Sequence, residues 1–246
     1  MNLKDISVVM LTKNSQRFLE TILSKLVNFG EIVIVDSGSN DNTLKIASTF
    51  KNVVIYKKDF TDFSDMKNFG VDKGVNNIIF SLDSDEIPSD EFIKELEKLN
   101  FEHETLYEID RVNIFNNKKI RCCGWYPDFI SRLFDRRYGR FNGYKVHEKI
   151  VGIDKNLKNL KLKGEILHYS YLHPRDFIDK MQKYTYLYAE QHKDKKSSIS
   201  KALTHASFTF FKNYIIQRGF LYGYEGYLIS AYNAQCVFWK YVKLIK

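Results

Sequence analysis

Three carboxylates follow directly on an apolar run in the first half of the chain. The run, residues 78–82, reads Ile-Ile-Phe-Ser-Leu, and Asp83, Asp85 and Glu86 come after it, with Ser84 between the two aspartates. Such a run is typical of a strand buried on both faces, and open α/β sheets bind ligands at the carboxyl ends of their strands. In extended chain, Asp83 and Asp85 point to the same side. Two close carboxylates repel each other unless a cation lies between them, and Mg²⁺ takes one or two carboxylates together with substrate phosphates. The segment therefore predicts a metal–diphosphate site, and the alternative is a solvated turn that caps the next helix.

A second polar cluster follows another apolar run. Residues 31–36 end in Asp36, and the loop after them begins with Ser37 and Gly38. A carboxylate here can accept hydrogen bonds from a nucleobase or a ribose, although ordinary strand-to-helix loop chemistry is the alternative. Polar residues thus gather at the ends of successive strands or just before them, which is the functional edge of such a sheet: Thr12, Asn14, Asp36, Lys67, Asn68 and Asp83.

The first hundred residues alternate strands with helices. This alternation predicts an α/β fold with parallel strands and helices on both faces of the sheet. Ser89 is predicted to cap the helix that follows Pro88. The predicted strands are 6–12, 31–36, 53–56 and 78–83, and the predicted helices are 18–27, 42–50, 65–73 and the segment after Pro88.

From about residue 104 the pattern changes to short strands joined by turns. Asn116 and Asn117 form a turn pair between two of them. This half is predicted to be antiparallel and to shape an acceptor face. The predicted strands are 106–115, 118–122, 129–134 and 144–151, followed by a helix over 174–192 and a polar linker over 193–200.

The last segment, residues 201–246, is rich in aromatic residues and carries six Lys or Arg but a single acid, Glu225. A basic, aromatic, amphipathic helix fits an anionic membrane interface. The alternative is a helical pair that packs on the catalytic domain or forms a homodimer.

The composition narrows the class of protein. The chain has 246 residues, 44% hydrophobic, a formal net charge of +8 and three cysteines, with a pI near 9.1. An odd cysteine count without a Cys-x-x-Cys pair favours a reducing compartment. We expect no signal peptide, because residues 1–5 lead directly into a predicted strand. We expect no spanning helix, because no stretch of about twenty residues is purely apolar. Neither a dinucleotide fingerprint nor a Walker loop occurs, which speaks against nicotinamide dehydrogenases and P-loop kinases.

Three segments in order, residues 7–14, 34–43 and 82–86, resemble family 2 glycosyltransferases of GT-A fold, a Rossmann-like nucleotide-sugar-binding sheet. Later segments are similar to the bacterial lipopolysaccharide-core β-1,4-glucosyltransferases: 132–134, 139–141, 146–148, 166–170 and 219–223. The predicted domains are a catalytic domain over 1–172, with a nucleotide-binding half (1–103) and an acceptor half (104–172), and a helical C-terminal extension over 173–246.

The resemblance implies a nucleotide-sugar donor, a divalent Mg or Mn cation and transfer with inversion. The nucleotide sugar would contact Thr12, Asn14, Asp36, Ser37, Lys67, Asn68, Asp83, Ser84 and Asp85. The metal ligands would be Asp83, Asp85 and His168, although His168 can equally be a buried structural histidine.

Inverting transfer needs a base for the acceptor hydroxyl. Glu148 is the first candidate and Asp128 the second, and the alternative for Glu148 is an ordinary salt-bridged strand residue. The Glu-Asp pair that many family members carry at the base position is missing here, which leaves the base open. His147 is predicted to orient the acceptor. Arg132 and Arg140, with Arg136 and Arg137 beside them, suit an anionic acceptor, and a solvated basic face is the alternative.

The predicted activity is transfer of a hexose, glucose from UDP-glucose, onto a heptose of the lipopolysaccharide inner core, at the cytoplasmic face of the bacterial plasma membrane. An enzyme alternative is a transferase for another glycan, a lipid-linked acceptor or a peptide. The other alternative is a basic protein that binds nucleic acid or lipid without catalysis. We expect no nucleic-acid partner, because the clustered acids would repel phosphates.

Overall fold

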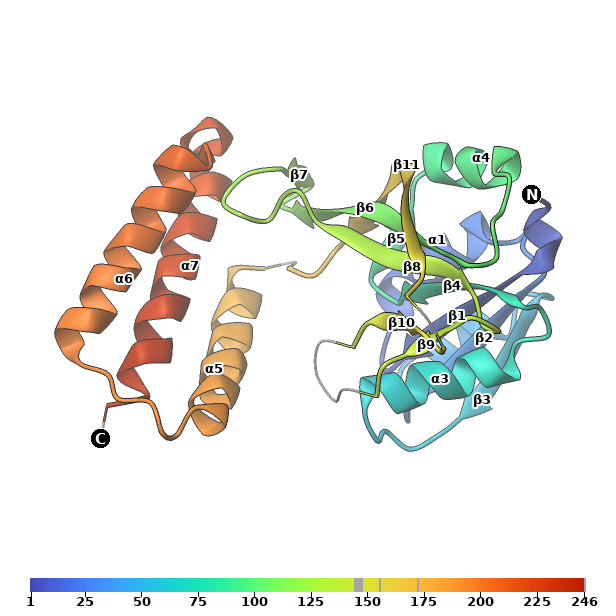
Figure 1. The fold of residues 1–246 in the computed structure, drawn as a ribbon, viewed down its shortest axis with the longest axis horizontal. Coiled ribbons are helices and arrows are strands. Elements are labelled where there is room, and N and C mark those ends of the chain that lie inside the picture. The colour runs from blue at the N-terminus through green and yellow to red at the C-terminus, as the bar shows by residue number, and fades with distance from the viewer. Residues whose placement is uncertain (144–147, 155, 172, 246) are drawn as a thin grey trace. The chain divides into compact units, whose positions relative to one another are not determined.

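The computed structural model describes residues 1–143, 148–154, 156–171 and 173–245 (Figure 1). The chain divides into two compact units. The first comprises Met1–Arg111 and Phe129–His168, and the second comprises Val112–Asp128 and Tyr169–Lys246. The helical unit therefore includes residues 112–128 from the middle of the chain, which the sequence assigns to the acceptor half. The predicted domain limits at 103 and 172 stay a prediction.

The first unit is a sheet covered by helices. Its elements are η1 (Leu3–Asp5), β1 (Ile6–Thr12), α1 (Gln16–Lys25), β2 (Glu31–Asp36), α2 (Thr43–Ala47), β3 (Val53–Lys57), α3 (Phe63–Lys73), β4 (Ile78–Asp83), β5 (Glu86–Pro88), α4 (Asp90–Lys98), the start of β6 (Thr105–Phe115), β8 (Phe129–Asp135), β9 (Gly139–Phe141), β10 (Ile150–Gly152) and β11 (Lys158–His168).

The main sheet has the strand order β3-β2-β1-β4-β8-β6-β11-β5 in the described residues. The strands β3, β2, β1 and β4 are parallel, as predicted, and β8 pairs antiparallel with both β4 and β6. In the register of the sheet, Thr12 lies beside Asp36 and Leu11 lies beside Asp83. The carboxyl ends of β1, β2 and β4 therefore meet at one edge, which confirms the assembly expected from the sequence.

Apolar layers cover both faces of the parallel half. On one face, Phe80 packs between Phe29 and Phe92, with ring centroids 6.2 and 5.4 Å away. On the other face, α3 approaches the sheet at Gly70, where a Cβ atom would lie 2.5 Å from a methyl carbon of Val9. A larger residue at this position would push α3 off the strands, so the glycine sets the distance between helix and sheet.

Two expectations for the acidic segment change in the structure. The strand β4 ends at Asp83, and Ser84 and Asp85 form a turn before β5 begins at Glu86. Asp83 and Asp85 are therefore not neighbours on one side of an extended strand, because the extended conformation ends at Asp83. Glu86 is not solvated but fully buried. The capped helix, by contrast, is confirmed: the Ser89 hydroxyl accepts a hydrogen bond from the Phe92 amide at 3.2 Å.

The antiparallel half is confirmed in outline. The strands predicted at 106–115, 118–122 and 129–134 correspond to β6, β7 (Lys118–Ile120) and β8, and the turn at Asn116 and Asn117 has positive φ at both residues. The predicted strand over 144–151 is described only from 148 onward, where β10 forms. The strands β5, β9 and β11 were not predicted.

The second unit is helical. It contains the end of β6, β7, α5 (Pro174–Gln191), α6 (Ile199–Phe211), the π-helical turn η2 (Lys212–Ile216), η3 (Gly219–Tyr222) and α7 (Gly223–Val242). Its core is aromatic: Tyr171 stacks on Phe177 with ring centroids 4.4 Å apart, and Trp125 stacks on Tyr171 at 5.0 Å. The predicted helical, aromatic C-terminal region is therefore confirmed. Among the described residues, no helix is long and apolar enough to cross a membrane.

Candidate nucleotide-sugar site

Asp36 organises the loop that follows β2. Its Oδ1 accepts from the Thr12 hydroxyl at 2.9 Å and from the Ser39 hydroxyl, and its Oδ2 accepts from the amides of Gly38 and Ser39 at 3.0 and 2.9 Å. Burial of Asp36 favours the neutral form, but these four hydrogen bonds outweigh it and hold the pKa of the carboxyl below its usual range. They occupy about all the positions at which a carboxylate accepts. Asp36 therefore fixes the loop in its ionised form.

The neighbouring loops are tied to this one. Asn14, which has a positive φ of 53°, receives the Asn40 amide on its side-chain oxygen at 2.9 Å and donates its own amide to Ser39 at 2.9 Å. Ser37 donates its amide to the Thr12 carbonyl at 3.0 Å. A further hydroxyl pair, Ser15 and Ser84 at 2.8 Å, joins the loop after β1 to the turn after β4. The three strand ends thus form one connected rim.

A hollow of about 260 Å³ opens beside Asp36. Its lining combines the loop after β2 with the end of β3, so that polar atoms surround one apolar side chain: Asp36, Gly38, Ser39, Leu44, Lys57, Lys58 and Asp59. Polar groups around a small apolar surface suit a flat heteroaromatic ring with charged substituents.

Asp83 lies between two buried cations. Lys67 Nζ is 3.1 Å from its Oδ1, and Arg132 donates to its Oδ2 at 2.6 Å. Burial favours the neutral acid, but the charges of Arg132 and Lys67 dominate and hold the pKa of Asp83 far below its usual range. Arg132 also donates to Glu86, which is 0% exposed and receives a second, longer contact from Arg111 at 3.4 Å. A compact set of alternating charges therefore supports the end of β4.

Lys67 links this set to the predicted base. Its ammonium group donates to Glu148 Oε1 at 2.9 Å while it remains within 3.1 Å of Asp83. The Lys67 side chain is 5% exposed and that of Glu148 18%. The structure thus brings Glu148 to the same edge as the carboxylates that follow the parallel strands.

Asp85 and His168 form a second, more open group. His168 Nε2 lies 3.4 Å from Asp85 Oδ2, and the Asp85 side chain is 43% exposed. Over the part of the chain that the structure describes, no three His, Cys, Asp or Glu side chains are arranged around one cation position. Mg²⁺ needs only one or two carboxylates where phosphates supply further oxygens. Asp85 and His168 therefore fit a cation that arrives with a diphosphate, whereas both oxygens of Asp83 already face cationic side chains.

Other predicted site residues have different surroundings. The Asn68 amide exchanges two hydrogen bonds with the backbone of Phe141, both 3.1 Å, and so holds β9. Arg140 forms an exposed, two-bond ion pair with Asp72 at 2.9 and 2.8 Å. Asp128 belongs to the second unit, and His147 lies outside the described residues. The predicted roles of these residues stay predictions.

Glu86 and the residues that end β3 are the part of this edge that sequence reasoning missed. Lys57 ends β3, Lys58 and Asp59 follow it directly, and all three line the hollow, so the rule that polar strand ends gather at one edge would have included them. Glu86 lies beside the predicted aspartates, but only the fold shows that it is the buried partner of Arg132.

Residues 7–152, more than half of the chain, match the family model described as "Glycosyl transferase family 2". An uncharacterized glycosyltransferase, RP128, of Rickettsia prowazekii is 26% identical over 98% of this chain and 87% of its own length. The lipopolysaccharide core biosynthesis glycosyltransferase LpsC of Rhizobium meliloti is 27% identical over 76% of this chain and 71% of its own length.

Among solved structures, S. aureus TarS (residues 1–349) superimposes with a TM-score of 0.48 at 16% identity, over 75% of this chain and 65% of the other. The match of the family model spans the parallel strands, the rim of polar loops, Lys67, Arg132 and Glu148. The chain is a glycosyltransferase and belongs to glycosyl transferase family 2.

Proposed function

We propose that this protein transfers glucose from UDP-glucose, with inversion, onto a heptose of a lipopolysaccharide inner core. The observation that carries the proposal is the assembly of the rim at Asp36, the open pair Asp85 and His168, and Glu148 at one sheet edge. Family membership supplies the reaction class, and the similarity to LpsC supports the acceptor class.

The nucleobase of the donor is proposed to occupy the hollow beside Asp36. Because the Asp36 oxygens are already engaged, the base would contact backbone groups of the loop or displace the Ser39 hydroxyl, which can rotate. Lys57 and Lys58 line the same hollow together with Asp36 and Asp59, so the charges of its lining balance and suit a neutral planar ring. The group proposed for the hollow is therefore a small planar nucleobase.

A divalent Mg or Mn cation is proposed at Asp85 and His168. When bound, such a cation offsets the negative charge that develops on a departing diphosphate. The Lys67 and Arg132 charges would hold the Asp83 carboxylate in place at the end of β4. The protein thus contributes a fixed acidic turn and leaves the remaining ligand positions to the diphosphate.

Glu148 is the proposed base. In an inverting transfer, the acceptor hydroxyl attacks the anomeric carbon of the donor sugar from the face opposite the diphosphate, and the bond to the diphosphate breaks. A base takes the proton of the attacking hydroxyl. The contact with Lys67 keeps Glu148 close to the end of β4, which favours this role over Asp128. Asp128 remains the second candidate.

The acceptor is proposed to be anionic and attached to the inner leaflet of the plasma membrane, so that the protein acts there as a peripheral enzyme or as a homodimer of such enzymes. Another glycan, a lipid-linked sugar or a peptide is the alternative acceptor. Reaction of the purified protein with Mn²⁺, a set of UDP-sugars and a truncated core oligosaccharide, followed by linkage analysis of the product, distinguishes these acceptors.

Titration of UDP into the wild type and Asp85→Ala, each with and without Mn²⁺, tests the donor site. We expect Mn²⁺ to strengthen UDP binding to the wild type and to have little effect on Asp85→Ala. Asp5→Ala, which removes an exposed carboxylate at the opposite end of β1, is the matched control. Equal binding by wild type and Asp85→Ala, or no binding by either, would contradict the proposal.

A further inference from the structure

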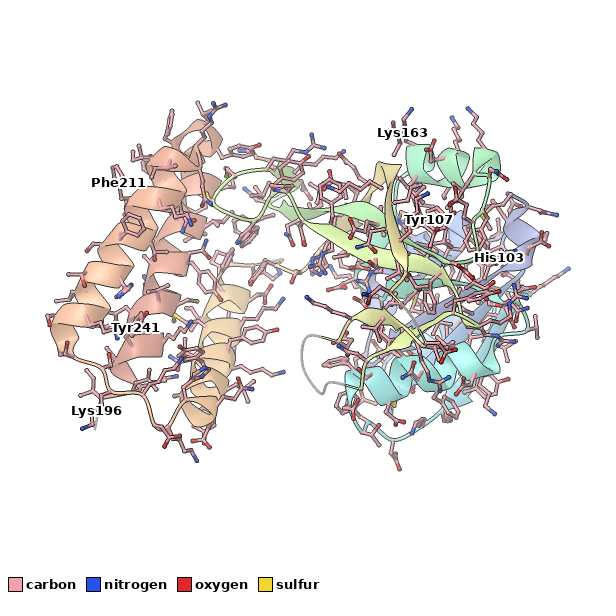
Figure 2. All side chains as sticks on the ribbon, in the orientation of Figure 1. His103, Tyr107, Lys163, Lys196, Phe211 and Tyr241 are labelled. Carbon is pink, nitrogen blue, oxygen red and sulfur yellow. The ribbon has the colours of Figure 1, made fainter. Side chains whose placement is uncertain are left out.

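The turn between α6 and α7 exposes a dense group of large apolar side chains. We name residues 208–227 the hairpin tip. Seven of its large hydrophobic side chains are between 48% and 64% exposed, although residues of these types are usually at least partly buried: Phe208, Phe211, Ile216, Phe220, Leu221, Tyr224 and Tyr227. Figure 2 labels Phe211 on α6.

The backbone of the hairpin tip is packed tightly from within. A Cβ atom on Gly226 would lie 1.8 Å from the Gly219 carbonyl oxygen, so the start of α7 touches η3 directly. The rings of Phe210 and Tyr227 lie 5.8 Å apart, and Tyr214 is 6.0 Å from Tyr227. The two helices therefore close on each other at this end (Figure 1). The exposed side chains surround a compact turn and are not left open by loose packing.

The exposed charges of the hairpin tip are positive. Lys212 and Arg218 are exposed. The acid of this segment, Glu225, is 3% exposed and accepts from Lys118 at 2.8 Å and from Asn116 at 2.7 Å. The solvent-facing surface is consequently apolar and positive. A second copy of the same surface would bring like charges together, whereas an anionic lipid bilayer complements both properties.

We propose that the hairpin tip inserts into the interface of an anionic lipid bilayer and holds the protein there as a peripheral membrane protein. Apolar side chains would enter the boundary between headgroups and acyl chains, while Lys212 and Arg218 meet lipid phosphates. The hairpin tip would be the surface by which the enzyme reaches a membrane-attached acceptor, and only this link to the acceptor rests on the proposed function.

Co-sedimentation with lipid vesicles tests the inference on the full chain. We expect the wild type to bind vesicles of phosphatidylcholine and phosphatidylglycerol, and Ile216→Ser/Leu221→Ser to bind roughly tenfold more weakly, because two apolar anchors are lost. The matched control is Ile178→Ser/Leu203→Ser, which removes two side chains, 55% and 53% exposed, outside the hairpin tip. Thermal unfolding by circular dichroism checks that both double variants are folded.

A charge variant separates the two contributions. Lys212→Gln should weaken binding to the anionic vesicles by about fivefold and leave the weaker binding to pure phosphatidylcholine unchanged. Absence of wild-type binding, or equal losses in the tip and control variants, would overturn the inference. So would a dimer, detected by sedimentation velocity, that only the tip variant disrupts.

UDP titration with Mn²⁺ on the tip variant keeps this test apart from that of the proposed function. Normal nucleotide binding with weak vesicle binding supports the lipid surface whatever the sugar acceptor. Vesicle binding by a protein that fails to bind UDP leaves the lipid surface standing and contradicts the donor site.

Discussion

Glu86 in the first unit and Glu225 in the second are both buried carboxylates with cationic partners, but their surroundings differ. The Arg132 partner of Glu86 is itself buried and binds a second carboxylate, Asp83. The Lys118 partner of Glu225 is 58% exposed. Arg132, Asp83 and Glu86 thus form a buried set of charges that depend on one another. In the second unit, by contrast, Glu225 is neutralised by a cation at the surface.

The two units also differ in whether their apolar side chains are buried or exposed. In the first unit they fill both faces of the parallel strands, and in the second the hairpin tip presents them to solvent. Burial of charge is costly unless each group is paired, and exposure of apolar area is costly unless a partner covers it. Each unit departs from ordinary packing in one way, and each departure coincides with a proposed binding surface.

Removal of one buried cation should break this comparison most strongly. Arg132→Met leaves Glu86 with the Asp83 amide at 3.1 Å and, as its remaining cationic contact among those described above, Arg111 at 3.4 Å, so we expect the free energy of unfolding to fall by about 3 kcal/mol. Lys118→Met in the second unit is the matched control and should cost about 1 kcal/mol or less, since its cation is exposed. Urea unfolding followed by circular dichroism measures both. Equal losses would show that the two acids are equivalent.

A second substitution examines how the buried charges serve the reaction. Lys67 holds Asp83 and Glu148 at the same time, so in Lys67→Met both carboxylates lose a common anchor. We expect kcat/KM to fall about 10²-fold, mainly through kcat, because small displacements of reacting groups cost this much. Lys67→Arg should restore part of the activity. A rise in the KM for the UDP-sugar with unchanged kcat would instead identify Lys67 as a simple diphosphate ligand.

The parallel half of this edge could be predicted from the sequence because its signals are local. The apolar runs that end at Thr12, Asp36 and Asp83 each mark a strand and its functional end, and the structure confirms all three bounds. The partners of Asp83 and Glu86 could not be predicted in this way. Arg132 reaches them from 49 and 46 residues away, through pairing of β8 with β4.

Short or irregular strands explain the other omissions. The strand β5 has only three residues, too few for a periodicity, and Glu86 at its start looks like part of an acidic turn. The strand β11 contains Gly164 with a φ of +86°, where a Cβ atom would lie 2.4 Å from the Phe92 amide nitrogen. Glycine is therefore required where β11 meets α4, but in the sequence it interrupts the strand pattern.

Acid should weaken the loop at Asp36 in a defined direction. The pKa of Asp36 is lowered below its ordinary value of 3.8 in the folded protein. Its contribution to stability is therefore complete above pH 3.8 and is lost as the pH falls through the lower, folded value. We expect Asp36→Asn to be about 1.5 kcal/mol less stable than the wild type at pH 7, because the donors of Gly38 and Ser39 lose a charged acceptor.

Urea unfolding at several pH values measures this effect. The difference between wild type and Asp36→Asn should shrink as the pH is lowered below 3.8, because the protonated wild-type side chain then resembles the variant. Asp5→Asn, at an exposed site, should show no such convergence. A constant difference across the range would mean that the side-chain amide fails for steric reasons and that ionisation of Asp36 contributes little.

The smallest effect is expected at Arg140, which lies on β9 of the first unit. Unlike Arg132, Arg140 is 45% exposed and pairs with an exposed partner, Asp72. Exposed ion pairs of this kind contribute little to folding, so Arg140→Gln should change the free energy of unfolding by less than about 0.5 kcal/mol. If Arg140 meets an anionic acceptor, the same variant should raise the KM for the acceptor several-fold, while kcat and the affinity for UDP stay unchanged. Asp72→Asn separates the two roles, because it removes the ion pair and leaves the cation. Normal acceptor KM in both variants would remove Arg140 from the acceptor site and leave it as a surface charge, in contrast to the buried cations around Asp83.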